Sequence, residues 1–427
     1  MPLPASNPAP RPGPPGLPRL LVGLDPSGAT MTLADHQRAH GPLPVLTGNE
    51  LIAAVERSGL RGRGGADFPA AVKLRAVADR AGRRGSVLVV NGSETEPASS
   101  KDRLLLSRLP HLVLDGAVLA AAAVGAREIL VKVGERATAA HQGLHSALAV
   151  RDDGVRIQLV AGPEGYIAGE ESAVVNYLAN DRALPTFVPP RPFERGYRGR
   201  PTLIQNPETL AQIALVARYG DGWYRELGTE ADPGSALVTI VGAVAAPGVY
   251  ELAFGTPMTD LLSAAGGSTE PVQALLVGGY FGTWVESSRA LRLRLARNDL
   301  RSVGCSLGSG VLAALGESAC GLHESARVID YLADQSAGQC GPCVFGLRAI
   351  ADSFAALADG VAHRREHERV LRWCSEVRGR GACHHPDGAV RFVESALGVF
   401  GADIGAHRGA RCHAAPAGLP LPRRRSR

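Results

Sequence analysis

The chain has 427 residues, which is too many for one hydrophobic core, so about two to four domains are expected. Hydrophobic residues make up 45% of the sequence and the formal net charge is +5, which indicates a folded protein with a scattered basic excess. No stripe of Lys and Arg with interleaved aromatic residues occurs, which argues against a nucleic-acid partner.

The N-terminus does not have the basic and apolar blocks of a signal peptide. The longest apolar stretch, 112–126, is too short to span a bilayer and contains Asp115. A cytoplasmic protein is therefore expected, peripheral at most to the inner face of a membrane.

Residues 1–45 are rich in Pro, Gly and Ala and predict a flexible leader with one short strand. From 46 to 227 the pattern alternates between strands and helices. The expected strands are 86–90, 128–133 and 155–160, and the expected helices are 110–124 and one that begins at 171. This alternation predicts an α/β domain with a mostly parallel sheet, which binds ligands at the carboxyl ends of its strands.

Residues 236–310 predict a smaller β-rich domain, because strand, turn, strand and helix follow one another as in a β-grasp module. Helical periodicity from 326 to 397 then predicts a helical domain at 320–403. The end of the chain, 404–427, is rich in Pro, Ala and Arg and predicts a disordered basic tail.

The seven cysteines all lie beyond residue 300, which favours a metal or redox region over a disulfide framework. Cys340 and Cys343 form a C-x-x-C pair, and Cys383 follows later in the helical domain. Three thiolates can hold a metal cluster but cannot close a four-thiolate cage. Ala337 stands where a C-x-x-C-x-x-C run would have another Cys. The remaining cysteines are expected to be small buried hydrophobes or surface thiols.

The first of four chemical motifs is the glycine-rich loop Gly59-Leu-Arg-Gly-Arg-Gly-Gly-Ala-Asp-Phe-Pro69, which is followed by Lys73. Its glycines allow the backbone to approach a ligand closely and to point N–H groups at a phosphate. A helix after Pro69 would add the positive end of its dipole. A flexible surface turn is the alternative for this loop.

The other three motifs are 90–97, which begins where the strand 86–90 ends, 165–172 and 202–209. They offer side chains that can hydrogen-bond a flavin, and glycine for close approach. Helix capping, a dipole partner and a plain turn are the respective alternatives. The residues concerned are Asn91, Ser93, Glu94, Glu96, Gly169, Glu170, Glu171, Gln205 and Asn206.

Together, in this order and followed by the cysteine trio, the motifs resemble the NADH- and FMN-binding flavoprotein (F) subunit of respiratory complex I. NAD-linked hydrogenases and formate dehydrogenases share this subunit type, and the similarity covers about residues 48–400. The resemblance implies a Rossmann-like FMN-binding domain, a β-grasp soluble-ligand-binding domain and a helical iron–sulfur domain. It also implies an NADH dehydrogenase-like oxidoreductase that passes electrons from NAD(P)H or another donor through FMN to an iron–sulfur cluster.

The resemblance also implies roles for single residues. Glu96 and Glu171 correspond to the acidic residues beside the nicotinamide of NAD(H), and Phe68 to an aromatic side chain that stacks on the adenine. The implied cofactor-binding residues are Gly62, Arg63, Gly64, Gly65, Phe68, Lys73, Asn91, Glu94, Tyr166, Gly169, Glu170, Gln205 and Asn206.

The chain departs from the family pattern at several positions. Asp67 replaces a glycine and adds a negative charge where an anionic dinucleotide is expected. The segment 188–191 lacks a cation and an aromatic residue of the family, and Ser93 replaces an Asp of the FMN motif. These departures bear on NADH binding more than on FMN binding.

The cysteine trio leaves three outcomes open. Cys340, Cys343 and Cys383 match three family ligands and could hold a [4Fe–4S] or [3Fe–4S] cluster, with His384, His385, water or nothing on the remaining iron. Zinc on three Cys and a neighbouring His is a second outcome. The third is that the thiols are remnants that bind no metal.

The implied redox partner is a ferredoxin, a [2Fe–2S] thioredoxin-like subunit or a membrane reductase. A rival interpretation follows from Ala337, Asp67 and the 188–191 segment. In it the chain is a non-catalytic assembly or regulatory subunit that kept the fold and lost NADH oxidation or the cluster.

Overall fold

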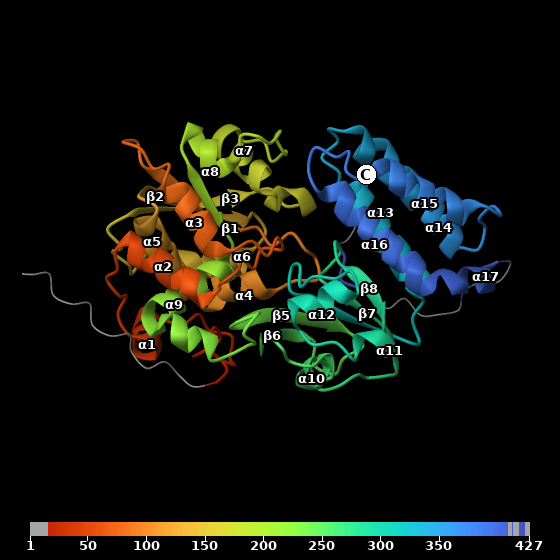
Figure 1. The fold of residues 1–427 in the computed structure, drawn as a ribbon, viewed down its shortest axis with the longest axis horizontal. Helices are drawn as coiled ribbons and strands as arrows, with labels where there is room; N and C mark the ends of the chain where they lie inside the picture. The colour runs from red at the N-terminus through yellow and green to blue at the C-terminus, as the bar shows by residue number, and fades with distance from the viewer. Residues whose placement is uncertain (1–15, 409–411, 413–417, 423–427) are drawn as a thin grey trace, which may run out of the picture.

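The computed structural model of the protein describes residues 16–408, 412 and 418–422. Figure 1 shows an α/β part, a second sheet beside it and a bundle of helices at the opposite end from α1. The α/β fold, the β-grasp sheet and the helical domain expected from the sequence are all confirmed.

The first sheet is parallel throughout, with the strand order β3-β2-β1-β4. Its strands are β1 (Ser86–Gly92), β2 (Ala126–Gly134), β3 (Arg156–Gly162) and β4 (Thr202–Gln205). Asn91 pairs with Lys132, and Val90 pairs with Gln205, so the carboxyl ends of β1, β2 and β4 meet at one edge. This edge is where a parallel sheet binds ligands.

Nine helices of the described chain belong to this part. They are α1 (Leu33–His40), α2 (Gly48–Ser58), α3 (Ala70–Ala78), α4 (Lys101–Arg108), α5 (Pro110–Ala123), α6 (Thr138–Leu148), α7 (Glu171–Asn180), α8 (Pro192–Arg195) and α9 (Pro207–Arg225). The apolar helix α5 is buried against α9. Gly116 permits this close packing, because a Cβ there would lie 1.8 Å from the carbonyl oxygen of Leu210.

The described part of the leader packs on the α/β core. It contains the helix α1 rather than the expected strand, because Thr32 caps a helix whose buried His36 and His40 face the core. His36 contacts Asp115 of α5 at 2.7 Å, and Arg151 and Arg218 pair with the same carboxylate. The leader is thereby tied to the domain by a buried charge cluster.

The second sheet is mixed, with the strand order β6-β5-β9-β7-β8. Its strands are β5 (Ser235–Gly242), β6 (Gly248–Ala253), β7 (Val272–Val277), β8 (Thr283–Glu286) and β9 (Val311–Gly316). Its helices are α10 (Met258–Ala264), α11 (Ser287–Ala290) and α12 (Arg297–Ser302). One face of the sheet packs on α10, and the other contributes to the core of the helical domain.

The helical domain consists of α13 (Gly321–Asp334), α14 (Arg348–Ala358), α15 (Glu366–Val377) and α16 (His385–Phe400), followed by α17 (Ile404–His407). Beyond α16, the described residues differ from the disordered tail expected over 404–427. Ile404 and Leu419 are buried, and the backbone N–H of Leu419 donates to Glu324 of α13. The terminal arginines at 423–425 and 427 lie outside the described residues.

Within the described residues, no single helix has the length and apolar character of a membrane span. The helices α4 and α5 have this length and apolar character only when they are taken together, and they are bent by 95° relative to each other.

The Asp115 cluster gives a test of the fold. Burial alone would raise the pKa of Asp115, but the hydrogen bond with His36 and the charges of Arg218 and Arg151 lower it below the ordinary value of 3.8. We expect Asp115→Asn to lose about 3–5 kcal/mol of unfolding free energy at pH 7, because the buried Arg218 loses its counter-charge and Arg151 keeps only Asp153. Urea unfolding followed by circular dichroism measures this loss.

The exposed neighbour Asp152 provides the matched control, and Asp152→Asn should stay within about 0.5 kcal/mol of wild type. A depressed carboxyl pKa stabilises the fold above the unfolded-state value. The difference between wild type and Asp115→Asn should therefore shrink as the pH falls below about 4. Equal midpoints at pH 7 would show that the cluster does not stabilise the fold.

Candidate functional site

The second and third motifs meet at the carboxyl edge of the first sheet. Asn91 donates its side-chain N–H to the carbonyl of Gly169 at 2.8 Å. A Cβ at Gly169 would lie 3.0 Å from Thr95 and 3.2 Å from the carbonyl oxygen of Ser93, so glycine permits this approach. The chain around 91–95 and the turn at 166–169 therefore form one wall of a candidate site.

The first and fourth motifs form the adjoining wall. The glycine-rich loop closes on itself, because Gly62 N–H donates to the carbonyl of Phe68 at 2.8 Å. A Cβ at Gly64 would come within 3.3 Å of the Cβ of Asn206, so this glycine lets the loop lie against the fourth motif. Phe68 is 52% exposed and keeps a free aromatic surface.

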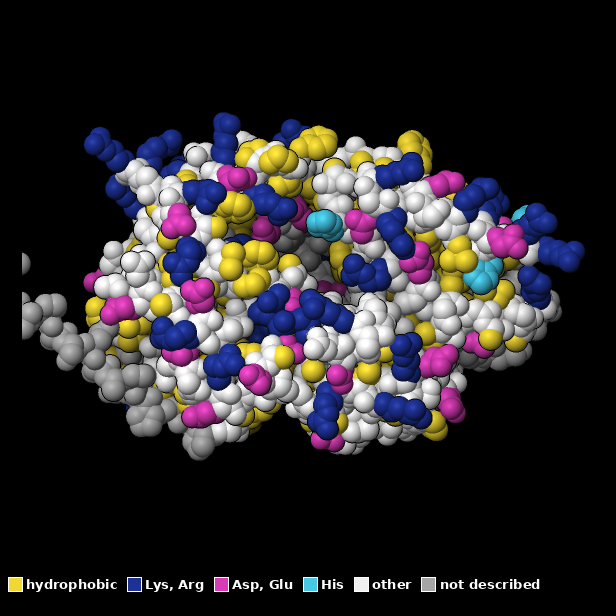
Figure 2. Space-filling view, in the orientation of Figure 1, with side chains coloured by type: hydrophobic (Ala, Val, Ile, Leu, Met, Phe, Trp, Pro, Cys, Tyr) yellow, Lys and Arg dark blue, Asp and Glu magenta, His cyan; other side chains and the backbone are white. Residues whose placement is uncertain are grey.

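Figure 2 shows that the surface is hollowed between the α/β part and the helical domain, with Lys and Arg side chains beside the hollow. Acidic side chains also lie beside the hollow, so the basic ones alone do not define its charge.

Glu96 joins three parts of the molecule at this site. Its Oε2 accepts hydrogen bonds from the hydroxyl of Tyr166 at 2.8 Å and from the N–H of Tyr280 at 2.7 Å. The N–H of Tyr166 in turn donates to Gln335 of the helical domain. Burial raises the pKa of Glu96 to about 7, although these hydrogen bonds act in the opposite direction. Glu96 can therefore change its protonation state near neutral pH.

The two acidic residues at the start of α7 have different partners. Glu170 is the N-cap and accepts a hydrogen bond from Ala173 N–H at 2.9 Å. Glu171, which is about half exposed, forms an ion pair with Lys73 of α3. The sequence predicts Lys73 at the cofactor site and Glu171 beside the nicotinamide, and in the structure the two side chains are in contact.

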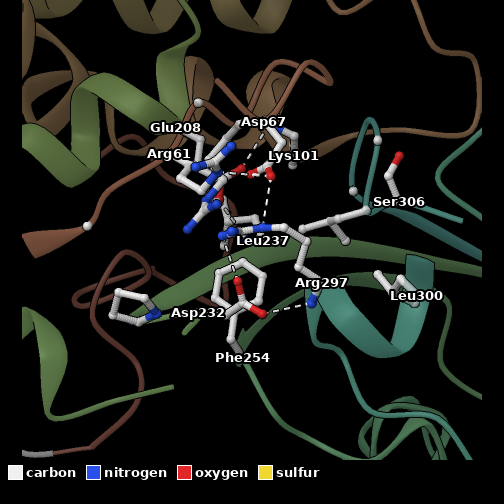
Figure 3. Close-up of a pocket in the computed structure, with 17 residues that line it drawn as sticks. Arg61, Asp67, Lys101, Glu208, Asp232, Leu237, Phe254, Arg297, Leu300 and Ser306 are labelled. Carbon is white, nitrogen blue, oxygen red and sulfur yellow. Dashed lines mark hydrogen bonds and ion pairs between the residues drawn. The ribbon is translucent and has the colours of Figure 1, made fainter. Parts of the chain in front are cut away.

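A pocket of about 640 Å³, including space open to solvent, lies between the glycine-rich loop and the β-grasp domain (Figure 3). Asp67 lies in this pocket with a positive φ of 48°, a conformation that suits the glycine it replaces. Its carboxylate lies 2.9 Å from Arg61 and 3.1 Å from Arg297. The negative charge of Asp67 is therefore compensated by Arg61 and by Arg297, which also pairs with Asp232 at 2.6 Å.

Arg63 lies in the interior rather than facing the predicted cofactor. Its guanidinium donates to the hydroxyl of Tyr224 at 3.3 Å and to the carbonyl of Ser235 at 3.2 Å. It also stacks on Phe254 and lies 3.7 Å from Glu208. Arg63 thus fixes the glycine-rich loop to the β-grasp domain.

Glu208 and Lys101 form a buried ion pair at 2.9 Å behind the loop. Burial lowers the pKa of Lys101, but the charges of Asp102 and Glu208 outweigh it and raise the pKa above its ordinary value. Asp102 also accepts a hydrogen bond from Asn206 at 2.6 Å, and burial raises the pKa of Asp102 above its ordinary value. Asn206 is therefore held by the protein on one side and caps α9 on the other.

Glu94 is occupied by the protein as well. It accepts hydrogen bonds from the N–H groups of Asp102 and Arg103 at 3.1 Å each and from the hydroxyl of Ser99 at 2.6 Å. These contacts satisfy the free N–H groups at the start of α4. The capping alternative therefore describes the observed contacts of Glu94.

Lys132 was not among the predicted site residues. It is fully buried at the end of β2 and donates to the hydroxyl of Ser93 at 2.6 Å and to the carbonyl of Ala168 at 3.0 Å. Burial lowers the pKa of Lys132 to about 8. The signal was present in the sequence, since Lys132 is a rare lysine in an arginine-rich chain.

Gln205 provides the test of whether a flavin fits the strand edge. Its side chain is buried at the end of β4, and its Nε2 has no hydrogen-bond partner within the described structure. A buried amide N–H without a partner is costly, and a flavin oxygen or nitrogen would satisfy it. The glycines at 62, 64, 65 and 169 leave backbone room for the same ligand, so the residues fit FMN.

The cysteine trio gathers where Cys340 and Cys343 follow α13 and Cys383 precedes α16. Cys343 is buried in a π-helical turn, Pro342–Leu347, a type of turn frequent at functional sites. Burial, followed by the proximity of Cys340 and Cys383, raises the pKa of Cys343 to about 12. Crowded thiols of this kind lose their protons when a metal binds. The donor set therefore fits an iron–sulfur cluster with three Cys ligands.

The two histidines suggested as a fourth ligand differ in their surroundings. The side chain of His384 is fully exposed and lies 3.7 Å from Asp387. His385 is buried, its Nε2 contacts the carbonyl of Leu332 at 2.8 Å, and its Nδ1 has no partner in the described part of the chain. Only His385 therefore has a buried nitrogen available.

Sequence models of three known domains match the chain. The Nuo51 FMN-binding domain matches residues 55–215, the SLBB domain 237–279, and the NADH-ubiquinone oxidoreductase-F iron–sulfur binding region 316–407. These matches cover the strand edge, the strands β5 to β7 of the β-grasp sheet, and the cysteine trio respectively.

Similar proteins agree with these matches. One of the NADH-quinone oxidoreductase F subunits of Rhizobium meliloti (strain 1021), the one numbered 2, is 31% identical over 377 residues, which cover 84% of this chain and 89% of that protein. The corresponding F protein of the NADH-quinone oxidoreductase of Mycobacterium tuberculosis (strain ATCC 25618 / H37Rv) is 30% identical, with 84% of each chain covered.

Among solved structures, an NAD⁺-reducing [NiFe]-hydrogenase in the H₂-reduced state is similar with a TM-score of 0.78 and 30% identity over 87% of this chain. The match spans only 64% of that hydrogenase chain. On the combined evidence of sequence and fold, the protein belongs to the family of NADH-quinone oxidoreductase F subunits.

Proposed function

We propose that this chain is an electron-transfer flavoprotein that takes electrons from NADH through FMN to an iron–sulfur cluster. The observation that carries the proposal is the meeting of four motifs at one strand edge, beside a domain with three gathered cysteines. The family supports the same activity, since its members are named NADH-quinone oxidoreductase subunits.

FMN accepts a pair of electrons as hydride and can release them one at a time. Gln205 Nε2 is the buried donor proposed to fix the ring, with Asn91, Gly169 and Glu170 on the adjoining wall. Backbone N–H groups of Gly64 and Gly65 and the cation of Lys73 are proposed to hold the phosphate. Tyr166 is positioned by Glu96 and Gln335 and closes the wall.

The carboxylate of Glu96 is proposed to stabilise the positive charge that forms on the nicotinamide ring. Because Oε2 accepts two hydrogen bonds and Oε1 accepts only a longer one, from the N–H of Ala98 at 3.3 Å, Oε1 is the oxygen that takes the proton when the carboxyl is neutral. Loss of a hydride leaves positive charge on the nicotinamide ring, and a carboxylate beside the ring stabilises that charge. The ionised form of Glu96 should therefore be the active one.

The dinucleotide is proposed to lie along the glycine-rich loop. Phe68 offers an exposed ring for stacking on adenine, and the pairing of Asp67 with Arg61 and Arg297 reduces repulsion of the phosphates. Glu171 is proposed to lie at the nicotinamide end of the dinucleotide, and its carboxylate forms an ion pair with Lys73.

The cluster is proposed to rest on Cys340, Cys343 and Cys383. His385 is the candidate for the remaining iron, because its Nδ1 is buried and without a partner in the described structure. The next carriers are proposed to be a ferredoxin, a [2Fe–2S] thioredoxin-like subunit or a membrane reductase. A cytoplasmic location at the inner face of a membrane is proposed with it, since the relatives are named as subunits of NADH-quinone oxidoreductase.

Ala337 favours a second candidate, an assembly or regulatory subunit that kept the fold without the redox chain. The absorption spectrum of the purified protein before and after addition of NADH distinguishes the two candidates.

We expect the purified protein, kept anaerobic, to show flavin absorption and a broad iron–sulfur shoulder that both bleach when NADH is added. The reason is that flavin and cluster share the donated electrons. Glu171→Gln should slow the bleaching, and Glu194→Gln on the exposed helix α8 serves as the matched control. A protein that stays colourless after reconstitution with FMN, iron and sulfide would favour the assembly role.

The raised pKa of Glu96 predicts a pH dependence. NADH turnover with an artificial acceptor should rise through about pH 7 in wild type. Turnover of Glu96→Gln should be roughly 10–100-fold lower and flat with pH, because a neutral amide resembles the protonated acid. Glu135→Gln, an exposed carboxyl, should keep the wild-type profile.

The same variant has a stability readout with a defined sign. The folded-state pKa of Glu96 lies above the ordinary value of 4.5, so wild type loses stability as the pH rises from about 4.5 to 7. The unfolding free energy of Glu96→Gln should therefore gain on wild type by about 1–3 kcal/mol over this range. A constant difference would show that Glu96 does not titrate there.

Ala337→Cys tests the incomplete ligand set. A fourth thiolate should raise the iron content per chain and strengthen the reducible EPR signal, because four Cys close the cage. Ala362→Cys, in a loop of the same domain, controls for an added thiol. Equal iron in both variants and in wild type would mean that the missing Cys does not limit the site.

A further inference from the structure

A second group of metal-ligating side chains lies at the end of the helical domain where α17 packs. Cys320, His323, His407 and Cys412 each offer one ligand atom, and these atoms all lie within 4.8 Å of one another. Cys320 is the N-cap of α13, His323 lies in the first turn of that helix, and His407 ends α17. None of the four belongs to the cysteine trio.

The distances within this group suit a single tetrahedral ion. Zn–S bonds of about 2.3 Å and Zn–N bonds of about 2.0–2.1 Å place S and N about 3.6 Å apart across a tetrahedral edge. The observed distance from Cys320 Sγ to His407 Nε2 is 3.5 Å. A two-iron cluster would instead separate its Cys pair from its His pair, because each pair binds a different iron.

Both histidines already have the outer partners that metal-bound imidazoles use. Nδ1 of His407 lies 2.6 Å from the carbonyl of Ala358, which holds the proton on Nδ1 and leaves Nε2 to face Cys320. Nε2 of His323 lies 3.3 Å from Asp359. A carbonyl or carboxylate on the second ring nitrogen orients the ring and raises the basicity of the ligand.

We propose that Cys320, His323, His407 and Cys412 bind one structural Zn²⁺. Two Cys and two His form a closed zinc set, with no position left for a reactant. The site is independent of electron transfer, because zinc does not change its oxidation state.

The ion would join segments that are distant in the sequence. Cys320 and His323 come from α13, and the outer partners Ala358 and Asp359 from the end of α14. Further along the chain, the N–H of Gly418 donates to Glu324 of α13 at 3.3 Å. Zinc would therefore fasten the C-terminal segment to the bundle at a point before this contact.

The test is metal analysis of the full-length protein, purified with flavin and cluster in place under reducing conditions. We expect about one Zn per chain in wild type, besides the iron. Cys412→Ser and His323→Asn should each lower zinc at least tenfold and leave iron and flavin unchanged. Cys340→Ser should do the reverse, lowering iron while zinc stays.

His363→Asn is the matched control, because His363 is exposed in the same domain and outside the group. X-ray absorption at the zinc edge of wild type gives a check that needs no variant. It should show two sulfur and two nitrogen neighbours at about 2.3 and 2.0–2.1 Å. Absence of zinc after growth and dialysis with added Zn²⁺, or loss of iron instead of zinc in Cys412→Ser, would overturn the proposal.

Discussion

The buried carboxylate of Glu208 is the constraint on which the arrangement of the first two domains depends. One oxygen lies 2.9 Å from the ammonium of Lys101, and the other accepts the N–H of Leu237 in β5. Arg63 of the glycine-rich loop lies beside the same group. Loop, α4, α9 and β-grasp sheet are thus fixed to one charged centre. Burial of such a charge is tolerated only while every partner is present, so the arrangement permits little variation.

The structure shows the partners of two residues that depart from the family pattern, Asp67 and Ser93. Asp67 would repel an anionic ligand if it were alone, but Arg61 and Arg297 surround it and its φ suits the turn. Ser93 stands where the family has an Asp, and the buried Lys132 donates to its hydroxyl. A carboxylate at that position would make an ion pair with Lys132. A neutral serine leaves the lysine charge uncompensated close to the wall that Asn91 and Gly169 form.

The sequence was sufficient to place the motif at 90–97 at a ligand-binding edge, because it begins where a strand of a parallel sheet ends, and β4 with the fourth motif lies directly beside that strand. It was not sufficient for Arg63 and Glu94, since the same residue types serve a ligand or the protein's own backbone, and only burial separates the two uses. The group of Cys320 and His407 was missed for another reason. Its C-x-x-H and H-x₄-C halves are short and far apart, and only the contacts of His407 with Cys320 and His323 at the start of α13 join them.

Tyr166 has a consequence for the order of maturation. Its hydroxyl binds Glu96 of the α/β domain, its N–H binds Gln335 after α13, and its ring contacts Phe281 of the β-grasp domain and His385 of α16. The complete set of contacts of this one side chain therefore forms only when all three domains are docked. A chain whose helical domain has not closed would present an incomplete flavin wall. Docking of the helical domain and completion of the wall proposed for FMN are therefore coupled, because the same side chain takes part in both.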